Sequence, residues 1–158
     1  MRTFLKLVGG AALALGILGG GYLAAGAVKA SRLEASGRAY IETQLPLILA
    51  NWSVETLQTQ AAPQLLKALT EQPDRLDTIR EGFDHLAKLG AYHHLSGLHG
   101  QTFIFSAGGE RMINASYQAT AVFDNGAARV HVRLTHESGA WRILEFSTDR
   151  PIFKNETT

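Results

Sequence analysis

The chain has 158 residues, of which 46% are hydrophobic and 18% are charged, and it contains no cysteine. The missing cysteines exclude disulfides, iron–sulfur clusters, thiolate zinc sites and a cysteine nucleophile. Arg2 and Lys6 precede a long apolar segment, and without these two the 15 basic residues become 13 against 14 acidic ones. A nearly neutral domain lacks the basic surface that neutralises phosphates, so we predict no nucleic-acid partner.

The apolar segment covers residues 7–28, which carry no charge. A stretch of about 20 apolar residues matches a bilayer core about 30 Å thick. We therefore predict a cytoplasmic n-region at residues 1–6 and a transmembrane anchor at 7–28, in a bacterial inner membrane. The alternative is a signal peptide cleaved near Ala25-Gly26-Ala27, because Gly19-Gly20-Gly21 could end a short apolar region early.

Basic residues flank this segment unequally. The amino terminus, Arg2 and Lys6 favour the cytoplasmic side, and Lys29 and Arg32 weaken that bias without cancelling it. Either interpretation of the segment places the C-terminal domain in the periplasm. Within the segment, Gly16 and Gly20 form a Gly-xxx-Gly pair of the kind that lets two membrane helices approach closely, which makes a homodimer one candidate partner.

A helical pattern follows the anchor. Residues 29–37 are small and polar, and they predict a linker or a continuation of the helix. A single apolar stripe with helical spacing comes next, and Pro46 inside it should kink or divide the helix. The stripe consists of Ile41, Leu45, Ile48, Leu49 and Trp52.

Two further helices are indicated by their ends. Ser53 is a predicted N-cap, and it precedes an apolar stripe from Leu57 to Leu69 that Pro63 interrupts. Pro73 and Asp74 mark the start of the third helix, and Gly90 suits the left-handed position that stops it. Its predicted buried face consists of Leu76, Ile79, Phe83 and Leu86.

After Gly90 the apolar period changes to that of strands. We predict strands over residues 92–98, 102–106, 112–123, 128–135 and 141–148. Asp124-Asn125-Gly126 is a hairpin turn in which Asn and Gly tolerate positive φ. Gly108-Gly109 and Ser138-Gly139 separate strands in the same way.

Helices followed by an antiparallel meander predict an α+β fold, with three helices packed on a curved sheet of four to five strands. We place this domain at residues 38–151 and expect 152–158 to be a flexible tail. Val130, Val132 and Leu134 alternate with Arg129, His131 and Arg133. One face of the sheet should therefore pack on the helices, and the other should be polar.

Four parts of this pattern resemble the nuclear transport factor two superfamily, whose members have a cystatin-like, cone-shaped α+β fold. These parts are the helix end from Phe83 to Gly90, the strand from Tyr117 to Phe123, the Asn125-Gly126 turn and the strand with Gly139, Trp141 and Ile143. The resemblance covers roughly residues 38 to 150, and it is closest to small bacterial exported members of unassigned function.

The resemblance implies a hydrophobic pocket between helices and sheet. The superfamily includes enzymes, ligand binders and tethered domains of bacterial secretion machines, so the fold does not fix the function. The candidate pocket-lining residues are Tyr40, Phe83, Asp84, Tyr117, Ala119, Ala121 and Trp141. Enzymes of the family need a buried acid or base, but no motif maps onto Asp84, His85 or the tyrosines. We therefore assign no catalytic residue and expect no cofactor.

The six histidines do not predict a metal site. His93 and His94 are adjacent, so a strand would point them to opposite faces. Zinc requires three or four convergent ligands. We therefore expect structural or solvated histidines and no bound metal.

The sequence predicts a membrane-anchored periplasmic binding or scaffold domain without catalysis. Its expected ligand is a protein partner or a small apolar molecule. One alternative is a pocket isomerase or hydrolase that uses Asp84 or a tyrosine. Another is a structural subunit of an envelope or secretion assembly.

Overall fold

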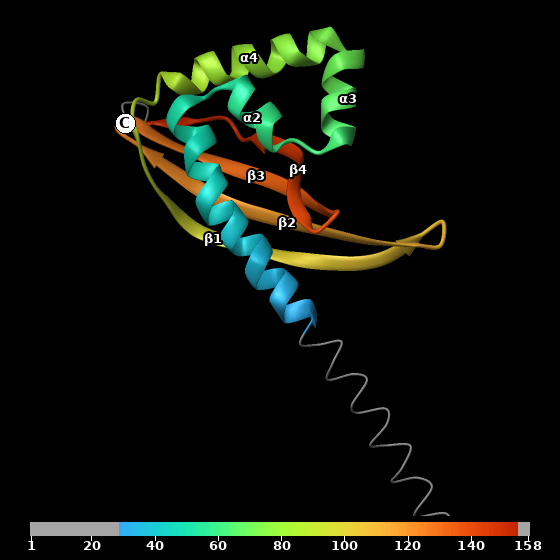
Figure 1. Cartoon of the computed structure of the whole chain (residues 1–158). Helices are drawn as coiled ribbons and strands as arrows, with labels where there is room; N and C mark the ends of the chain where they lie inside the picture. The colour runs from blue at the N-terminus through green and yellow to red at the C-terminus, as the bar shows by residue number, and fades with distance from the viewer. Residues whose placement is uncertain (1–28, 155–158) are drawn as a thin grey trace, which may run out of the picture. The chain divides into compact units, whose positions relative to one another are not determined.

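The computed structural model describes residues 29–154, and within them the chain has four helices and an antiparallel sheet of five strands. The helices come first and the strands follow, which confirms the predicted α+β class. Figure 1 shows α2, α3 and α4 gathered over one face of a curved sheet.

The sheet is a meander whose first four strands are neighbours in chain order. They are β1 (Tyr92–Ala107), β2 (Glu110–Phe123), β3 (Gly126–Glu137) and β4 (Ala140–Thr148). The short β5 (Ile152–Phe153) returns to pair with the start of β3. In the described part of the chain, β1 is therefore one edge of the sheet.

The helices are divided differently from the prediction. The first helix covers residues 29–51. α2 (Val54–Gln60) and α3 (Pro63–Glu71) replace the single second helix, and α4 (Pro73–Ala87) is the predicted third. Both α3 and α4 begin with a proline, which removes no hydrogen bond there because the first N–H groups of a helix have no intrahelical acceptor.

Two local predictions in the helical region had different outcomes. Ser53 is the N-cap of α2, and its hydroxyl accepts a hydrogen bond from the Thr56 N–H at 3.3 Å, as predicted. Pro46 does not divide the first helix, because the apolar residues that precede and follow it in the chain are both packed into the core. Its neighbours Ile41, Leu45, Ile48 and Leu49 are each at most 2% exposed.

The start of the domain is helical. Residues 29–37, predicted as a linker or a continued helix, belong to the first helix, which runs without interruption past residue 38. No helix among the described residues is long and apolar enough to cross a membrane. The predicted n-region (1–6) and the anchor or signal peptide (7–28) lie outside the described residues.

The core forms between the helices and one face of the sheet. Val130, Val132 and Leu134 are at most 1% exposed, whereas the alternating Arg129 and Arg133 are exposed, so the predicted two-faced sheet is confirmed. An aromatic cluster closes one end of the core. The ring centroid of Trp52 lies 5.5 Å from that of Phe83 and 5.5 Å from that of Phe123.

β1 is one 16-residue strand where two strands, 92–98 and 102–106, were predicted. It stays paired with β2 because a β-bulge absorbs the irregular stretch, in which Gly97 and Leu98 face the single residue Ala119. Gly97 has a φ of +65°, which only glycine adopts readily.

The turn between β2 and β3 lies at Asp124-Asn125, as predicted, but for a different reason. Neither Asn125 nor Gly126 has a positive φ. The Asn125 N–H instead donates to the Leu89 carbonyl at 2.8 Å, so the loop after α4 holds the turn. A Cβ at Gly126 would overlap the Ile152 carbonyl oxygen, so glycine is required by the close approach of β5.

The predicted flexible tail is wrong for residues 152–154. Ile152 and Phe153 pair with Ala127 and Gly126, and the Lys154 N–H donates to the Asn125 carbonyl at 2.9 Å. Buried Pro151 directs the chain back onto β3. Residues 155–158 lie outside the described part.

Gly126→Ala is expected to lower the free energy of unfolding by about 1–3 kcal/mol, because the new methyl group must displace the β5 backbone. The control is Gly82→Ala on α4, where an added Cβ has nothing within 4 Å. Alanine should stabilise that helix by about 0.5–1 kcal/mol. Denaturation of both variants, followed by circular dichroism, measures the difference. Equal stabilities would contradict the packing of β5 on Gly126.

Candidate functional site

The structure brings most of the predicted pocket residues together, but it buries them. Phe83, Tyr117, Ala119, Ala121 and Trp141 are each at most 7% exposed. They belong to the packed layer between helices and sheet. Trp141 donates a hydrogen bond from its indole N–H to the Ser36 hydroxyl at 2.9 Å.

The two remaining candidates lie at the margin of this layer or outside it. Asp84 is exposed on α4 and does not join the buried residues. Tyr40 is half-buried on the first helix, and its hydroxyl donates to the Gln60 side-chain oxygen at 2.9 Å. Burial raises the pKa of Tyr40 to about 12, although the nearby Arg142 opposes this rise. The hydroxyl therefore stays protonated at neutral pH and is a poor general base.

Tyr40 should make the fold sensitive to alkali. Unfolded tyrosine ionises near pH 10, whereas the folded residue ionises near pH 12, so the free energy of unfolding falls as pH rises through this interval. Tyr40→Phe removes this titration and should flatten the fall. Urea denaturation of both proteins at pH 8 and pH 11 measures it. An equal loss of stability in the two proteins would contradict the burial of the phenol.

The most distinctive surface feature is a projecting hairpin, residues 101–113, which we call the arm. β2 pairs with β3 only from Asn114 onward, opposite Thr135, whereas it pairs with β1 as far as Glu110. The last residues of β3 stay with β4 instead. From residue 104 to residue 113 the arm therefore extends beyond the rest of the sheet as two strands, as Figure 1 shows.

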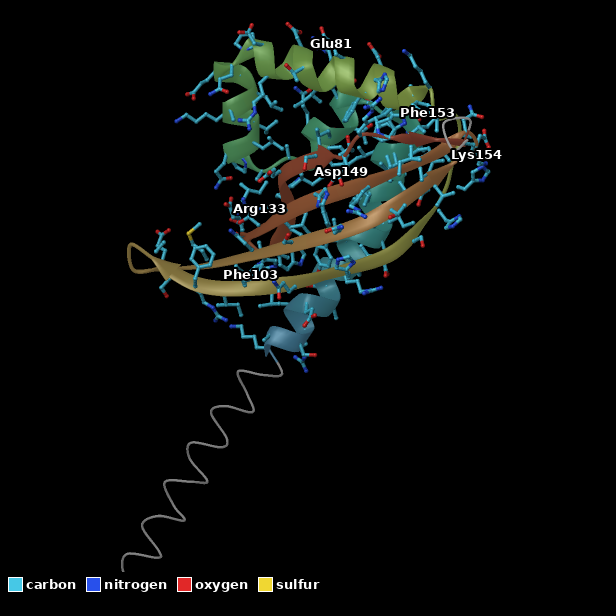
Figure 2. All side chains as sticks on the ribbon, turned by 180° about the vertical axis from the view of Figure 1, so that it is seen from behind. Glu81, Phe103, Arg133, Asp149, Phe153 and Lys154 are labelled. Atoms are coloured by element: carbon cyan, nitrogen blue, oxygen red, sulfur yellow. The ribbon has the colours of Figure 1, made fainter. Side chains whose placement is uncertain are left out.

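The middle of the arm is apolar on both faces. Phe103, Ile104 and Phe105 are 44%, 40% and 43% exposed. Ile104 pairs with Ile113 on the helix-facing side, and Phe105 pairs with Met112 on the outer side. Figure 2 shows Phe103 on the arm, across the sheet from Glu81 of α4. Three consecutive exposed apolar residues are unfavourable on a protein surface in water, so such a run usually serves a function.

Local structure fixes the direction of the arm. At its base, Gly100 lies so close to β2 that a Cβ would overlap the Ser116 carbonyl oxygen and the Tyr117 ring. At its tip, Gly108 and Gly109 have φ values of +61° and +85°, which suit a two-residue turn matching the strand twist. The arm is therefore a regular extension of the sheet.

The outer face beside the arm is polar, and its charges are paired. Arg133 donates to Glu145 at 3.1 Å, and both Arg129 and His131 contact Asp149, at 3.8 and 3.2 Å. Each of these side chains is well exposed, so each pair contributes little to stability. The face is a set of neutralised pairs and offers no strong single-sign charge to a partner.

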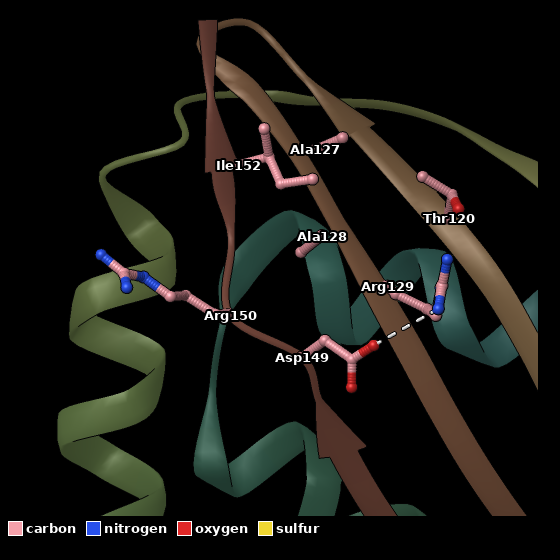
Figure 3. A pocket seen from close by; sticks show the side chains of 7 residues that line it. All are labelled: Thr120, Ala127, Ala128, Arg129, Asp149, Arg150 and Ile152. Atoms are coloured by element: carbon pink, nitrogen blue, oxygen red, sulfur yellow. Dashed lines mark ion pairs between the residues drawn. The ribbon is translucent and has the colours of Figure 1, made fainter. Parts of the chain in front are cut away.

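The hollows on this surface are open to solvent, with volumes of about 280 and 370 Å³. Figure 3 shows one of about 280 Å³, in which Arg129 and Asp149 form their ion pair. Small-molecule sites usually enclose about 300–1,000 Å³ and bury most of the ligand. Its lining residues are Thr120, Ala127, Ala128, Arg129, Asp149, Arg150 and Ile152. An open hollow of this size is a poor small-molecule site.

Several histidines have local partners. His93 contacts the Asp124 carboxylate at 2.6 Å, and His99 contacts the Gly97 carbonyl at 2.8 Å. The His93 hydrogen bond, together with the Ala91 N–H, lowers the pKa of Asp124. This contact ties the start of β1 to the β2–β3 turn. Within residues 29–154, no three potential metal ligands gather in one place.

Comparison with known proteins gives no relative from which a site could be transferred. The chain matches no protein-family model, no curated protein and no solved structure. The resemblance to the nuclear transport factor two superfamily stays a prediction. The arm was not predicted, although one signal was available: apolar residues at 103, 104 and 105 break the alternation expected of a strand with one polar face.

Proposed function

We propose that this chain is a membrane-tethered, non-catalytic interaction domain in the periplasm and that the arm is its binding surface. The observation that carries the proposal is the exposure of Phe103, Ile104 and Phe105 on a strand pair that projects from the sheet. Protein contacts bury aromatic side chains preferentially. A tether at residues 7–28 agrees with this role, because it would restrict the domain to one surface.

The interior supports a non-catalytic role. Among the described residues, no acidic or basic side chain is buried. A pocket enzyme of the predicted kind needs an acid or base facing a cavity, but Asp84 is exposed and the Tyr40 hydroxyl holds its proton. Ala119 and Ala121, at 3% and 0% exposure, leave no surface for a ligand.

The fold is also consistent with the proposed resemblance to the nuclear transport factor two superfamily. Helices precede an antiparallel meander, and Trp141 lies in the penultimate strand beside the first helix. Tethered domains of secretion machines belong to that superfamily. A structural subunit of an envelope assembly would use the same surface.

Single cysteines test the proposal cleanly, because the chain has none of its own. Phe105→Cys reports on the arm, and Glu81→Cys on α4 is a control that is also exposed. Each variant of the full chain is treated with a membrane-impermeant maleimide in spheroplasts and again after dilution in detergent. We expect the Glu81→Cys variant to react in both conditions and the Phe105→Cys variant to react fully only in detergent.

Two results would overturn the proposal. Equal labelling of the Phe105→Cys and Glu81→Cys variants in spheroplasts would show that nothing covers the arm. Labelling of the Glu81→Cys variant only after the cells are lysed would place the domain in the cytoplasm.

A further inference from the structure

Among the described residues, no strand pairs with the outer edge of β1 along the arm. Natural sheets protect their edges with charges, prolines, bulges or covering elements, because an exposed edge pairs readily with another strand. The first half of β1 is protected: it is bulged at Gly97, and Arg38, Glu42 and Pro46 of the first helix line a hollow beside it. Residues 101–107 have no charge, no proline and no bulge.

We propose that two copies of this chain pair antiparallel through residues 101–107 of β1, with Ile104 at the centre of the contact. This inference rests on the proposed function and names its partner. Residues that face each other across paired strands point to the same side of the sheet. Pairing about Ile104 satisfies this condition, since it places Phe103 of each copy opposite Phe105 of the other.

The two-sided character of the arm favours edge pairing over stacking of faces. Stacking two outer faces would cover Phe103 and Phe105 but leave Ile104 and Ile113 exposed. Edge pairing brings like side chains together on both faces at once. It also continues the β2–β1 sheet through the second copy as a four-stranded ribbon.

A second copy suits this edge better than a charged partner or a bilayer. The segment offers no charge for a partner to neutralise, and being uncharged it does not repel itself. Insertion of the tip into lipid would bury Glu110 and Arg111, which are exposed. An isologous contact uses the same edge on both copies, so both edges are occupied in the dimer and no further copy can add.

Disulfide formation tests the register. Directly opposed residues in antiparallel strands have Cα atoms about 4.5–5.5 Å apart, which is within disulfide reach. Ile104→Cys in the full chain should therefore give, under mild oxidation in native membranes, a dimer of twice the 17.1 kDa chain. Phe103→Cys alone should stay monomeric. In the proposed register residue 103 lies opposite residue 105 of the other copy, so the two cysteines at position 103 are not opposed. Coexpression of Phe103→Cys with Phe105→Cys should restore the dimer.

Ser147→Cys, exposed on β4, is the control for contacts made by other parts of the chain, and it should stay monomeric. Dimers formed equally by the Ser147→Cys and Ile104→Cys variants would overturn the register. A monomeric Ile104→Cys variant would overturn the second copy as partner. If the thiol of Phe105→Cys is nevertheless protected from maleimide, the proposed function stands and the arm is covered by another protein or by lipid. If that thiol reacts freely, both proposals fail.

Discussion

Replacing Trp52 with alanine is expected to lower the free energy of unfolding by about 3–5 kcal/mol. The indole is 9% exposed and lies between the rings of Phe83 and Phe123, each 5.5 Å away. These rings come from α4 and β2, so the residue joins the first helix to both. Its loss leaves a cavity where three elements meet. Thermal and urea denaturation of the full chain in detergent, followed by circular dichroism, measures the effect.

Two variants make this prediction specific. Leu47→Ala lies on the first helix, five residues before Trp52, but it is 50% exposed, so it should change stability by less than about 0.5 kcal/mol. Trp52→Phe should retain most of the stability, because the indole N–H makes no hydrogen bond within the described residues and acts through packing. A Trp52→Ala protein as stable as Leu47→Ala would contradict the placement of the aromatic cluster.

Ile104→Lys is expected to weaken self-association by at least about tenfold, which corresponds to about 1.4 kcal/mol. In the proposed pairing, the two lysines would lie directly opposite each other, and like charges in that position repel. Because the side chain is 40% exposed in the single chain, the domain should still fold. Sedimentation of the full chain in detergent, over a range of concentrations, measures the monomer–dimer equilibrium.

Ile152→Lys is the matched control for this charge. Ile152 is also an exposed isoleucine, at 67%, but it lies on β5 and away from the arm. The lysine there should leave association unchanged. A similar loss in both variants would assign the effect to net charge, and no loss in either would mean that the arm edge does not pair.

Much of the fold follows from local signals in the sequence. The N-cap at Ser53, the proline at the start of α4 and the glycine turns depend on a few neighbouring residues, and all appear where predicted. The alternation in β3 correctly separates the buried from the exposed face, because period two fixes the side of every residue once the strand is recognised.

The parts that were missed depend on contacts distant in sequence. β5 forms because Gly126 lets residue 152 approach, and nothing near Ile152 itself indicates a strand. β1 is continuous because β2 supplies a partner across the glycine-containing bulge. Local sequence cannot report either pairing.

The candidate site was missed for a similar reason. Whether the arm projects from the sheet depends on how far β3 follows β2, and that pairing stops at Asn114. Most of the residues predicted to line a pocket lie instead in the packed layer between helices and sheet. Alanines at 119 and 121 permit close packing there, and the structure uses that space for the core.

Hydrogen exchange along β1 tests most directly whether the arm is a pairing edge. In an unpaired arm, the outward-facing N–H groups of residues 101–107 exchange quickly, whereas pairing with a second strand would slow them. The full chain is measured in proteoliposomes at low and high protein density. We expect protection within residues 101–107 to rise with density while exchange in α4 stays constant. Exchange in residues 101–107 that is fast and equal at both densities would contradict the arm as a pairing edge between two copies.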